Sequence, residues 1–394
     1  DKITVSSSNS ISITNLTPDS AFYFKVEAVN DSGASYTTEV LGGIPSDIKH
    51  EILIVNGFER TSGTNNTFDY IRMYGEPTMQ NGVSFSSTSN DAVYKGFVNL
   101  NDYEIVIWML LDESTANETF NTMEQGLVAD YLKNGGKLMV TGSEIGWDLV
   151  EKGSDSDKAF YRDYLRARYI SDAPNNQSAT FYTANPLYLG NLDGLGDIKF
   201  DDGTHGTIDV DWPDAISNIE EGIGLTEVES GYKGITDLSK GYSGISHIGY
   251  FGDGKIIGNL VYLAFPFETI YPESQRVAVL EKIMNYMYNS VISVDDESNN
   301  TPTEYLLIQN YPNPFNPSTT IKYSIPLNRK SETSNTKLIV FDILGREVAT
   351  LVNQTQQAGI YEVKFDASGL SSGTYFYRIS SGEFFDSKKM ILLR

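Results

Sequence analysis

The stretch Ile105-Val106-Ile107-Trp108-Met109-Leu110 decides the fold of the largest part of this chain. Six consecutive apolar residues leave no polar face, which is typical of a strand buried on both sides in a parallel sheet covered by helices. Ile52-Leu53-Ile54-Val55 and Lys137-Leu138-Met139-Val140 repeat the pattern. Residues 119–132 carry apolar side chains at helical spacing and precede a glycine stop. The sequence therefore predicts a three-layer, flavodoxin-like α/β domain with a parallel sheet over residues 47–290.

Three loops follow these strands and should meet at one edge of the sheet, where ligands bind in such folds. They are Asn56–Arg60, Asp112–Ser114 and Thr141–Asp148. The third loop has the composition of a tight turn between strand and helix, which lifts one side chain above the sheet. The predicted ligand-contacting residues on these loops are Asn56, Phe58, Glu113, Trp147 and Asp148.

The third loop, Thr141-Gly142-Ser143-Glu144-Ile145-Gly146-Trp147-Asp148, resembles the nucleophile elbow of class I glutamine amidotransferase-like proteins. That resemblance implies a cysteine at the position that Ser143 or Glu144 occupies here, and the chain has no cysteine. It also implies a histidine and a glutamate in a later Phe-His-Pro-Glu segment. The comparable segment 263–269 keeps Glu268 and lacks the histidine. Because a thiolate relay needs sulfur and imidazole, glutamine hydrolysis by that route is excluded.

Ser143 could act as a nucleophile only with a histidine base within hydrogen-bond reach. The chain has three histidines. His50 precedes the first strand and is expected at the opposite end of the sheet, whereas His205 and His247 lie in later glycine-rich segments. The competing interpretation is that Ser143 and Glu144 cap the helix that follows them.

Carboxylates offer a second candidate chemistry, because two opposed carboxylates can hydrolyse a glycosidic bond and a neighbouring tyrosine could serve a lyase. With 52 acidic residues in the chain, several near any cleft are also expected by chance. Aromatic side chains could stack on sugar rings or simply belong to the core. The candidate carboxylates are Asp112, Glu113, Glu144, Asp148 and Glu268, and the candidate aromatics are Phe58, Trp108, Trp147 and Trp212.

Residues 201–214 contain an acidic cluster that could bind calcium. Asp201, Asp202, Asp209 and Asp211 offer closely spaced oxygens on a glycine-containing loop, although their spacing does not match an EF-hand. The alternative is an irregular loop held by Asx-turns. Calcium is the one cofactor that the sequence suggests, since the glycine-rich stretch 222–254 has no phosphate-binding pattern.

Residues 305–394 change to short alternating strands punctuated by glycines, which predicts a separate immunoglobulin-like antiparallel β-sandwich. They begin with the proline-rich run Asn310-Tyr311-Pro312-Asn313-Pro314-Phe315-Asn316-Pro317, whose prolines favour an extended segment. They end with Lys388-Lys389-Met390-Ile391-Leu392-Leu393-Arg394.

This region resembles the C-terminal sorting domain of proteins exported by the type IX secretion system of Bacteroidetes-type bacteria. The matching features are the YPNPFNP run, residues 340–348, the turn at residues 370–375 and the basic-apolar final strand. The resemblance implies contact with the secretion machinery and either display on the outer-membrane surface or release from the cell. The alternative is an immunoglobulin-like spacer without a sorting role.

Residues 1–46 resemble the C-terminal part of a fibronectin type III domain, on the motif Leu16-Thr17-Pro18 followed by Tyr23-Phe24-Lys25-Val26-Glu27-Ala28-Val29-Asn30. No signal-peptide pattern opens the chain, so we expect it to begin inside a longer precursor. Residues 291–304 are polar, acidic and proline-terminated, which predicts a linker where a processing protease could cut.

Composition narrows the functional classes. The net charge of −23 should repel nucleic acid and anionic lipid. The absence of cysteine excludes disulfides, and no run of 18 apolar residues predicts a transmembrane helix. Two hypotheses remain: a non-catalytic surface module for adhesion, glycan or matrix contact, or a polysaccharide-degrading hydrolase or lyase with a carboxylate-based site in the central domain or in further N-terminal domains.

Overall fold

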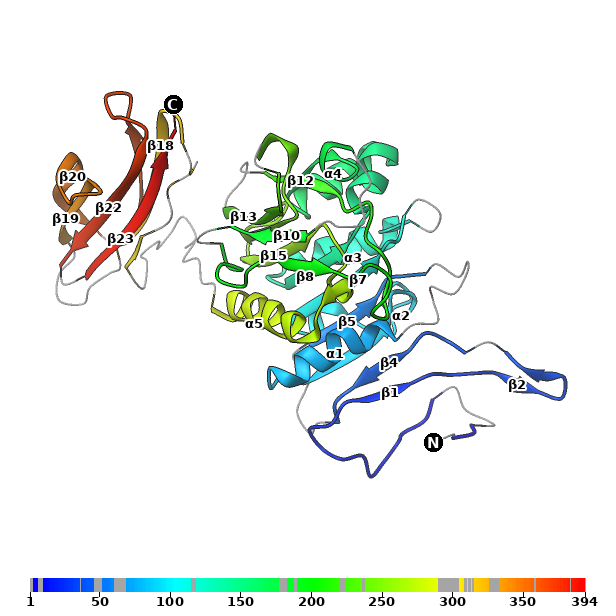
Figure 1. The fold of residues 1–394 in the computed structure, drawn as a ribbon. Helices are drawn as coiled ribbons and strands as arrows, with labels where there is room; N and C mark the ends of the chain where they lie inside the picture. Colours follow the sequence, from blue (N-terminus) through cyan, green and yellow to red (C-terminus); the bar gives the residue numbers. More distant parts are fainter. Residues whose placement is uncertain are drawn as a thin grey trace. The chain divides into compact units, whose positions relative to one another are not determined.

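The computed structural model describes residues 3–5, 10–35, 37–45, 52–59, 69–114, 118–176, 183–187, 190–219, 224–235, 238–289, 305–307, 310, 313, 315–325, 333–357, 359–382 and 384–393. The chain forms two compact units, which we call the first unit (Asp1–Ser290) and the second unit (Val291–Arg394) (Figure 1). The predicted linker at 291–304 lies outside the described residues.

A mixed sheet of 12 strands forms the centre of the first unit. Five neighbouring strands in it are parallel, which confirms the predicted parallel pairing of the three apolar runs. Numbered along the chain, these five strands lie in the order 2-1-3-4-5, the order of flavodoxin-like sheets. In spatial order they are β6 (Phe85–Ser89), β5 (Ile52–Asn56), β7 (Ile105–Leu111), β8 (Lys137–Gly142) and β15 (Gly258–Leu263).

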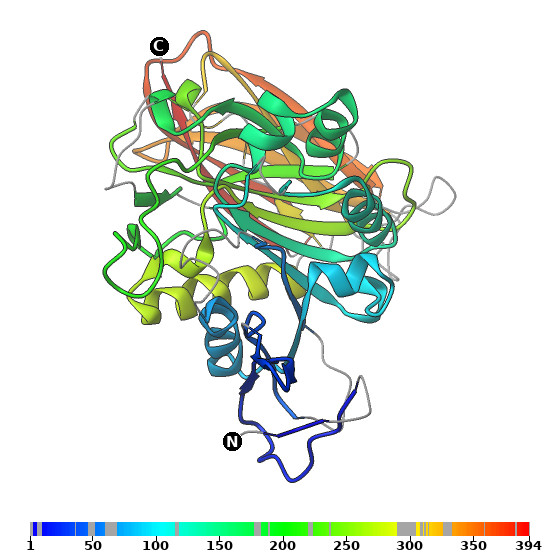
Figure 2. The same cartoon turned by 90° about the vertical axis from the view of Figure 1, so that its right-hand side faces the viewer.

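Helices cover both faces of these parallel strands, as the double-sided burial of the strands requires. Alternate strand residues such as Ile52 and Ile54 pack with α1 (Tyr70–Gln80) and α5 (Glu273–Asn289). The residues between them pack with the helices of the opposite layer. The expected three layers are therefore present (Figures 1 and 2). The opposite layer contains α2 (Asn90–Tyr94), α3 (Thr122–Lys133) and α4 (Asp155–Asp163).

Antiparallel strands extend the sheet beyond β15, so the sheet is mixed and not purely parallel. Four of them come from the long segment between β8 and β15, and β16 follows β15. The same segment contains the antiparallel pair β9 (Ala167–Ser171) and β12 (Ala215–Asn218). Glycine and serine interrupt several of these strands, and no continuous apolar run marks them in the sequence. The added strands are β14 (Gly244–Gly249), β13 (Gly224–Tyr232), β10 (Thr183–Pro186), β11 (Ile198–Phe200) and β16 (Ile270–Tyr271).

The N-terminal segment adds two strands to the other edge of the sheet. β1 (Phe22–Phe24) pairs with β4 (Leu41–Gly43), and Gly43 of β4 pairs with Ser86 of β6. A small hairpin, β2 (Val29–Asn30) and β3 (Gly33–Ala34), projects from these strands. The fibronectin type III assignment of this segment stays a prediction. Among the described residues, no helix is long and apolar enough to span a membrane.

The second unit consists of two antiparallel sheets with one shared apolar core. Core residues Ile321 and Tyr323 come from one sheet, and Leu338 and Tyr377 come from the other. The predicted small β-sandwich is confirmed. One sheet contains β17 (Leu306–Leu307), β18 (Ser318–Ile325) and β21 (Gly359–Asp366); the other contains β20 (Glu347–Gln357), β19 (Thr333–Asp342), β22 (Gly373–Ser381) and β23 (Phe384–Leu392).

The proline-rich run of the second unit holds its last strand in place. Phe315 is buried, its N–H donates to Ile391 O at 2.9 Å, and its carbonyl accepts from Leu393 N at 2.9 Å. Asn313 Oδ1 accepts a hydrogen bond from Ile391 N at 2.8 Å. Asn310 N donates to the Tyr377 hydroxyl at 2.7 Å. This part of the motif therefore has a structural role within the sandwich.

Candidate ligand-binding site at the strand ends

The candidate site begins at the carboxyl ends of β7 and β8, where two residues other than glycine adopt positive φ. Leu111 has φ 47° and Glu144 has φ 66°. Ser143 N donates to Leu111 O at 2.8 Å and joins the two strand ends. Residues other than glycine rarely adopt a positive φ, because the backbone conformation is strained. Such backbone strain is concentrated at functional sites. Glu144 therefore occupies the strained position of the elbow, residues 142–145, which precedes Gly146 and the helical turn Trp147–Lys152.

A pocket of about 210 Å³, which we call the strand-end pocket, opens beside this elbow. Residues 208–212 of the segment between β8 and β15 lie over the strand ends and supply one of its walls. The pocket thus combines residues of the elbow with residues of the acidic segment 201–214. The pocket is lined by Asp112, Ser143, Glu144, Ile208, Asp209, Val210, Asp211 and Trp212.

The surroundings of the pocket are strongly acidic. One buried oxygen of Asp209, Oδ1, has no hydrogen-bond partner among the described residues. Burial raises the pKa of Asp209, and the negative charges of Asp211, Asp202 and Asp201 raise it further. Burial, followed by the charge of Asp211, raises the pKa of Asp172 to about 6. Burial is the main cause of both shifts, and the charges of neighbouring carboxylates add to it.

Ser143 has no histidine base among the described residues of the pocket. Its hydroxyl donates to the carbonyl of Leu111 at 3.3 Å. His247 is fully buried in β14, where its ring contacts Phe251 and burial lowers its pKa to about 3. His205 stacks on Tyr271, and His50 lies outside the described residues. The geometry therefore offers no support for a serine nucleophile.

Asp214 accepts hydrogen bonds from the two backbone N–H groups that follow the elbow. Its carboxylate accepts the N–H groups of Gly146 and Trp147, and it is fully buried. Burial raises the pKa of Asp214 well above its usual range, and the nearby charges of Glu144 and Asp172 add to the effect. Gly146 is required here, because a Cβ would lie 2.7 Å from the Tyr169 ring. These two N–H groups already have an acceptor from the same chain and are not open to an anionic ligand.

The five predicted ligand-contacting residues do not line the strand-end pocket. Asn56 Oδ1 accepts from Phe58 N at 3.1 Å, and Phe58 packs edge-on against Tyr70. Glu113 is fully buried and accepts from Glu59 N. The other two lie past the elbow: Asp148 Oδ2 accepts from the backbone and hydroxyl of Thr119, and Trp147 lies under the ammonium group of Lys152.

Glu268 is fully buried after β15 and also lies outside the pocket lining. Its Oε2 accepts from the Tyr74 hydroxyl at 2.5 Å, and its Oε1 has no hydrogen-bond partner among the described residues. Burial raises the pKa of Glu268 to about 7, with a smaller contribution from the charge of Asp112. Of the four candidate catalytic residues, Asp112, Ser143 and Glu144 therefore share one pocket and Glu268 does not.

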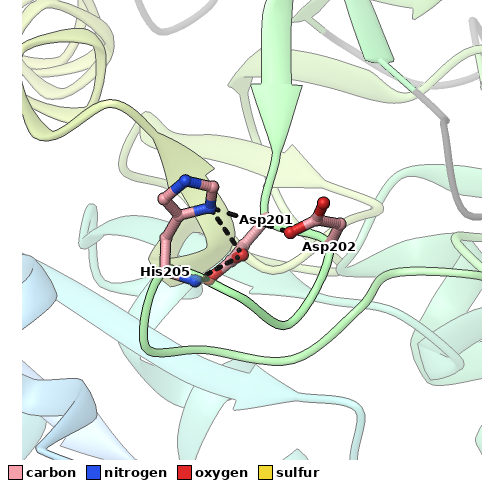
Figure 3. Close-up of side chains that lie close together, drawn as sticks. All are labelled: Asp201, Asp202 and His205. Carbon is pink, nitrogen blue, oxygen red and sulfur yellow. Dashed lines mark hydrogen bonds and ion pairs between the residues drawn. The ribbon is translucent and has the colours of Figure 1, made fainter.

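The predicted calcium ligands divide into two groups. Asp209 and Asp211 line the strand-end pocket, whereas Asp201 and Asp202 lie together with His205 (Figure 3). One ligand atom from each of these last three residues lies within 4.8 Å of the others.

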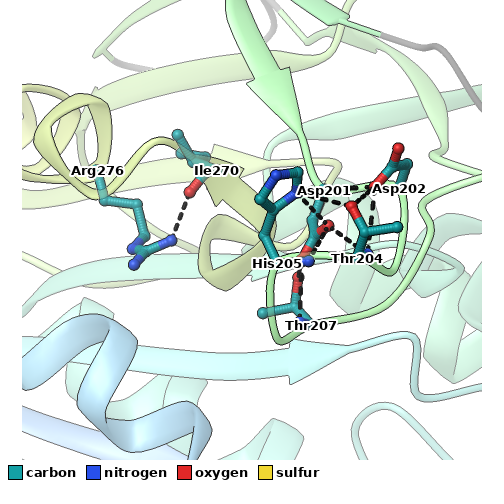
Figure 4. Close-up of polar contacts among 7 residues, drawn as sticks. All are labelled: Asp201, Asp202, Thr204, His205, Thr207, Ile270 and Arg276. Carbon is teal, nitrogen blue, oxygen red and sulfur yellow. Dashed lines mark hydrogen bonds and ion pairs between the residues drawn. The ribbon is translucent and has the colours of Figure 1, made fainter.

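The Asp201 carboxylate is already used by its own loop (Figure 4). It accepts the backbone N–H groups of Thr204, His205 and Thr207, and also the Thr207 hydroxyl. Burial would raise the pKa of Asp201, but these hydrogen bonds lower it below its usual range. The arrangement favours the Asx-turn interpretation, in which the carboxylate organises the loop. Calcium binding here stays a prediction.

Fold and site together define the first unit as a doubly wound α/β unit with an acidic pocket at its strand ends. The second unit is a β-sandwich, and residues 309–393 match the family model described as the secretion system C-terminal sorting domain. The predicted type IX sorting domain is thereby confirmed. It marks proteins that are secreted or attached to the outer-membrane surface of Bacteroidetes, and it implies interaction with the type IX secretion machinery. A comparison with curated proteins finds no match for the chain.

Proposed function

We propose that the first unit of this exported protein is a glycan-binding module built on an amidotransferase-like scaffold that has lost its chemistry. The observation that carries the proposal is the strand-end pocket, which combines four carboxylates with Trp212. Carboxylates accept hydrogen bonds from sugar hydroxyls, and an aromatic ring offers a surface for the C–H groups of a sugar face. The sorting domain delivers the pocket to the outside of the cell, where polysaccharides are found.

Three features support binding over amidotransferase chemistry. The resemblance to that family implies a cysteine where this chain has Ser143 or Glu144, and the chain has no cysteine. The described pocket residues include no histidine. Asp214 occupies two backbone donors directly after the elbow. An acyl-transfer site needs an activated nucleophile, a base and free donors for the developing oxyanion, and the described residues of this pocket place no histidine base beside the Ser143 hydroxyl.

The volume of the pocket limits the size of the bound group. At about 210 Å³ it is smaller than the roughly 300–1,000 Å³ of pockets for drug-sized ligands. A single sugar residue, at a chain end or a branch, fits this space better than a continuous stretch of polysaccharide. Binding of one residue is weak, and it suits a surface protein that contacts a polymer at many points.

The experiment that tests the proposal is isothermal titration of the purified chain with a panel of soluble oligosaccharides. Trp212→Ala should weaken binding about tenfold, because the loss of an aromatic contact costs on the order of 1 kcal/mol. Trp147→Ala is the matched control, because Trp147 is also half-buried near the elbow but does not line the pocket. Failure of every oligosaccharide to bind, or equal losses in both variants, would contradict the proposal.

A second candidate function is glycoside hydrolysis, and one observation favours it. Asp112 and Glu144 line the same pocket, which is the arrangement that a pair of catalytic carboxylates needs. The measurement is the release of reducing ends from extracellular polysaccharides by the purified chain. Activity that disappears in both Asp112→Asn and Glu144→Gln, with unfolding temperatures unchanged, would replace the binding proposal by an enzymatic one.

A further inference from the structure

We infer that the first unit has a second binding site, for a small zwitterion such as an amino acid, between α1 and α5. The site is a pocket of about 520 Å³, which we call the helix pocket. Its volume lies within the range of about 300–1,000 Å³ that is typical of small-molecule pockets. The described linings of the helix pocket and the strand-end pocket have no residue in common. The helix pocket is lined by Lys25, Asp69, Arg72, Met73, Glu76, Gly206, Glu273 and Arg276.

The helix pocket has balanced charge, with three basic and three acidic side chains in its described lining, although the chain has a net charge of −23. Most of these charges already bind one another. Arg72 donates two hydrogen bonds to Glu76 Oε1, at 2.9 and 3.2 Å, and forms an ion pair with Asp69 at 3.6 Å. Lys25 is also paired with Asp69, at 3.5 Å. These four side chains neutralise one another, which leaves one cation and one carboxylate of the lining for a ligand.

The remaining cation is Arg276, which has no ion pair with a carboxylate among the described residues. Its Nη1 donates to the carbonyl of Ile270 at 2.6 Å, and its buried Nε has no hydrogen-bond partner among the described residues (Figure 4). Burial lowers the pKa of Arg276 in spite of the nearby carboxylates, so an anionic partner would stabilise its charged form. A guanidinium presents a planar fork of N–H donors that matches a carboxylate. Arg276 is therefore the group that would bind the carboxylate of a ligand.

The remaining carboxylate is Glu273, which lies three residues before Arg276 in the first turn of α5. Positions three residues apart lie on the same face of a helix, and both residues line the helix pocket. Glu273 Oε1 accepts from Gln80 Nε2 at 2.8 Å, and no basic side chain among the described residues is paired with Glu273. An ammonium group of a ligand at Glu273 and its carboxylate at Arg276 would compensate both charges.

This arrangement favours a zwitterion over a ligand with two negative charges. A second carboxylate or a phosphate would meet the negative charges of Glu273 and Glu76, and like charges in a partly desolvated pocket repel strongly. A simple amine would leave Arg276 without an anion. A molecule that carries an ammonium group next to a carboxylate meets both requirements.

A well-ordered loop supplies a further wall of the helix pocket, through Gly206. The Asp201 carboxylate holds this loop by accepting its backbone N–H groups (Figures 3 and 4). The loop is also fixed to β16, because the His205 ring stacks on Tyr271 with ring centroids 3.7 Å apart. β16 therefore positions both the loop and Arg276, to which it offers the Ile270 carbonyl.

The test is isothermal titration of the full chain with the common amino acids, one at a time. We expect at least one of them to bind. Its methyl ester, which lacks the carboxylate, and its N-acetyl form, which lacks the ammonium group, should each bind at least about tenfold more weakly, because each loses a charged hydrogen bond to the pocket. Succinate, which has two carboxylates and no ammonium group, should not compete.

Two variants assign each charge of the ligand to a residue. Arg276→Gln should abolish the preference for the amino acid over its methyl ester. Glu273→Gln should abolish the preference over the N-acetyl form, and because Glu273 is exposed, this variant provides a second test if Arg276→Gln fails to fold. Lys282→Gln and Glu281→Gln are the matched controls: they make the same changes in net charge at exposed positions of α5 outside the pocket and should leave both preferences intact.

Several results would overturn this inference. One is the failure of every amino acid to bind, and another is equal affinity for the amino acid and its methyl ester. Binding that both Arg276→Gln and Glu273→Gln leave unchanged would place the ligand elsewhere. Tighter binding of succinate than of any amino acid would exclude a zwitterion as the ligand. None of these results bears on the proposed glycan-binding function, because that function depends on the lining of the strand-end pocket.

Discussion

The two units use their buried polar groups in opposite ways. In the second unit, the backbone N–H of the buried Asn310 donates to the Tyr377 hydroxyl, and its side-chain amide donates to the Thr319 hydroxyl. In the first unit, the buried carboxyls of Asp214 and Glu268 each keep one oxygen without a partner among the described residues. Folding alone favours satisfied polar groups. These contacts of the second unit are the ones that stability alone requires, whereas the first unit retains two buried carboxyl oxygens that folding alone does not explain.

The largest effect should come from the segment that holds the last strand of the second unit. Phe315→Ala removes a buried ring and should destabilise the sandwich by about 3–5 kcal/mol. Hydrogen exchange of the amides of β23 in the full chain measures this directly. Phe376→Ala, on the exposed side of β22, is the control and should change exchange little. Slow exchange of β23 in Phe315→Ala would show that the motif has another purpose.

A steric clash next to the elbow should give the next largest loss of stability. Gly146→Ala would place a Cβ 2.7 Å from the Tyr169 ring and 2.8 Å from the Tyr161 hydroxyl, and should cost about 2–3 kcal/mol of the unfolding free energy of the first unit. Gly126→Ala is the control, because α3 has open space at that position. It should stabilise by about 0.5–1 kcal/mol, as alanine favours helix. Urea unfolding of the full chain measures both.

The same elbow shows what the sequence could and could not predict. Continuous apolar runs identified β5, β7 and β8, and parallel pairing of these strands then placed Asp112, Ser143 and Glu144 at one edge. Local sequence contains nothing that brings residues 208–212 to that edge, because their position depends on the antiparallel strands between β8 and β15. Those strands lack long apolar runs, so their pairing is decided by tertiary packing.

The sorting motif could be predicted because its signal is local in the sequence, unlike the position of residues 208–212. Its residues are consecutive in the sequence, and the contacts of Asn313 and Phe315 with the last strand stay within one small sandwich. The sequence of residues 141–148 predicted a tight turn after β8, and the positive φ of Glu144 lies within that turn. The role of Asp214 could not be predicted, since it lies 68 residues beyond the glycine whose N–H it accepts.

A pH dependence should follow from Glu268. Its pKa is about 7 in the folded chain and 4.5 as the ordinary value, so the folded state binds the proton more tightly. Protonated Glu268 therefore contributes to the free energy of unfolding. The contribution is fully present below about pH 4.5 and is lost as the pH rises through 7. Relative to Glu268→Gln, the natural chain should lose on the order of 2 kcal/mol between these pH values. Unfolding in urea at pH 4.5, 6 and 8 measures the difference.

The matched control for that series is Glu281→Gln, on the exposed side of α5, which makes the same substitution outside the core. Other buried acids such as Glu124 and Asp214 also titrate in the folded chain, but they are common to both proteins and cancel in the comparison. A pH-independent difference between the natural chain and Glu268→Gln would mean that Glu268 is ionised with a partner, and the contrast between the two units would weaken.

The smallest effect should be a gain in stability at Glu144. A glutamate at φ 66° is strained, and glycine adopts this conformation readily, so Glu144→Gly should stabilise the first unit by about 0.5–1 kcal/mol. Glu144→Gln keeps the positive φ and removes the charge. Comparing the two variants therefore separates the effect of backbone strain from the effect of the carboxylate charge. Glu118→Gly, at φ 62° and exposed, shows the gain in stability expected at a position that does not line the pocket. If Glu144→Gly gains stability and loses oligosaccharide binding, the strained glutamate serves the ligand at the expense of folding; a loss of stability would instead make it part of the scaffold.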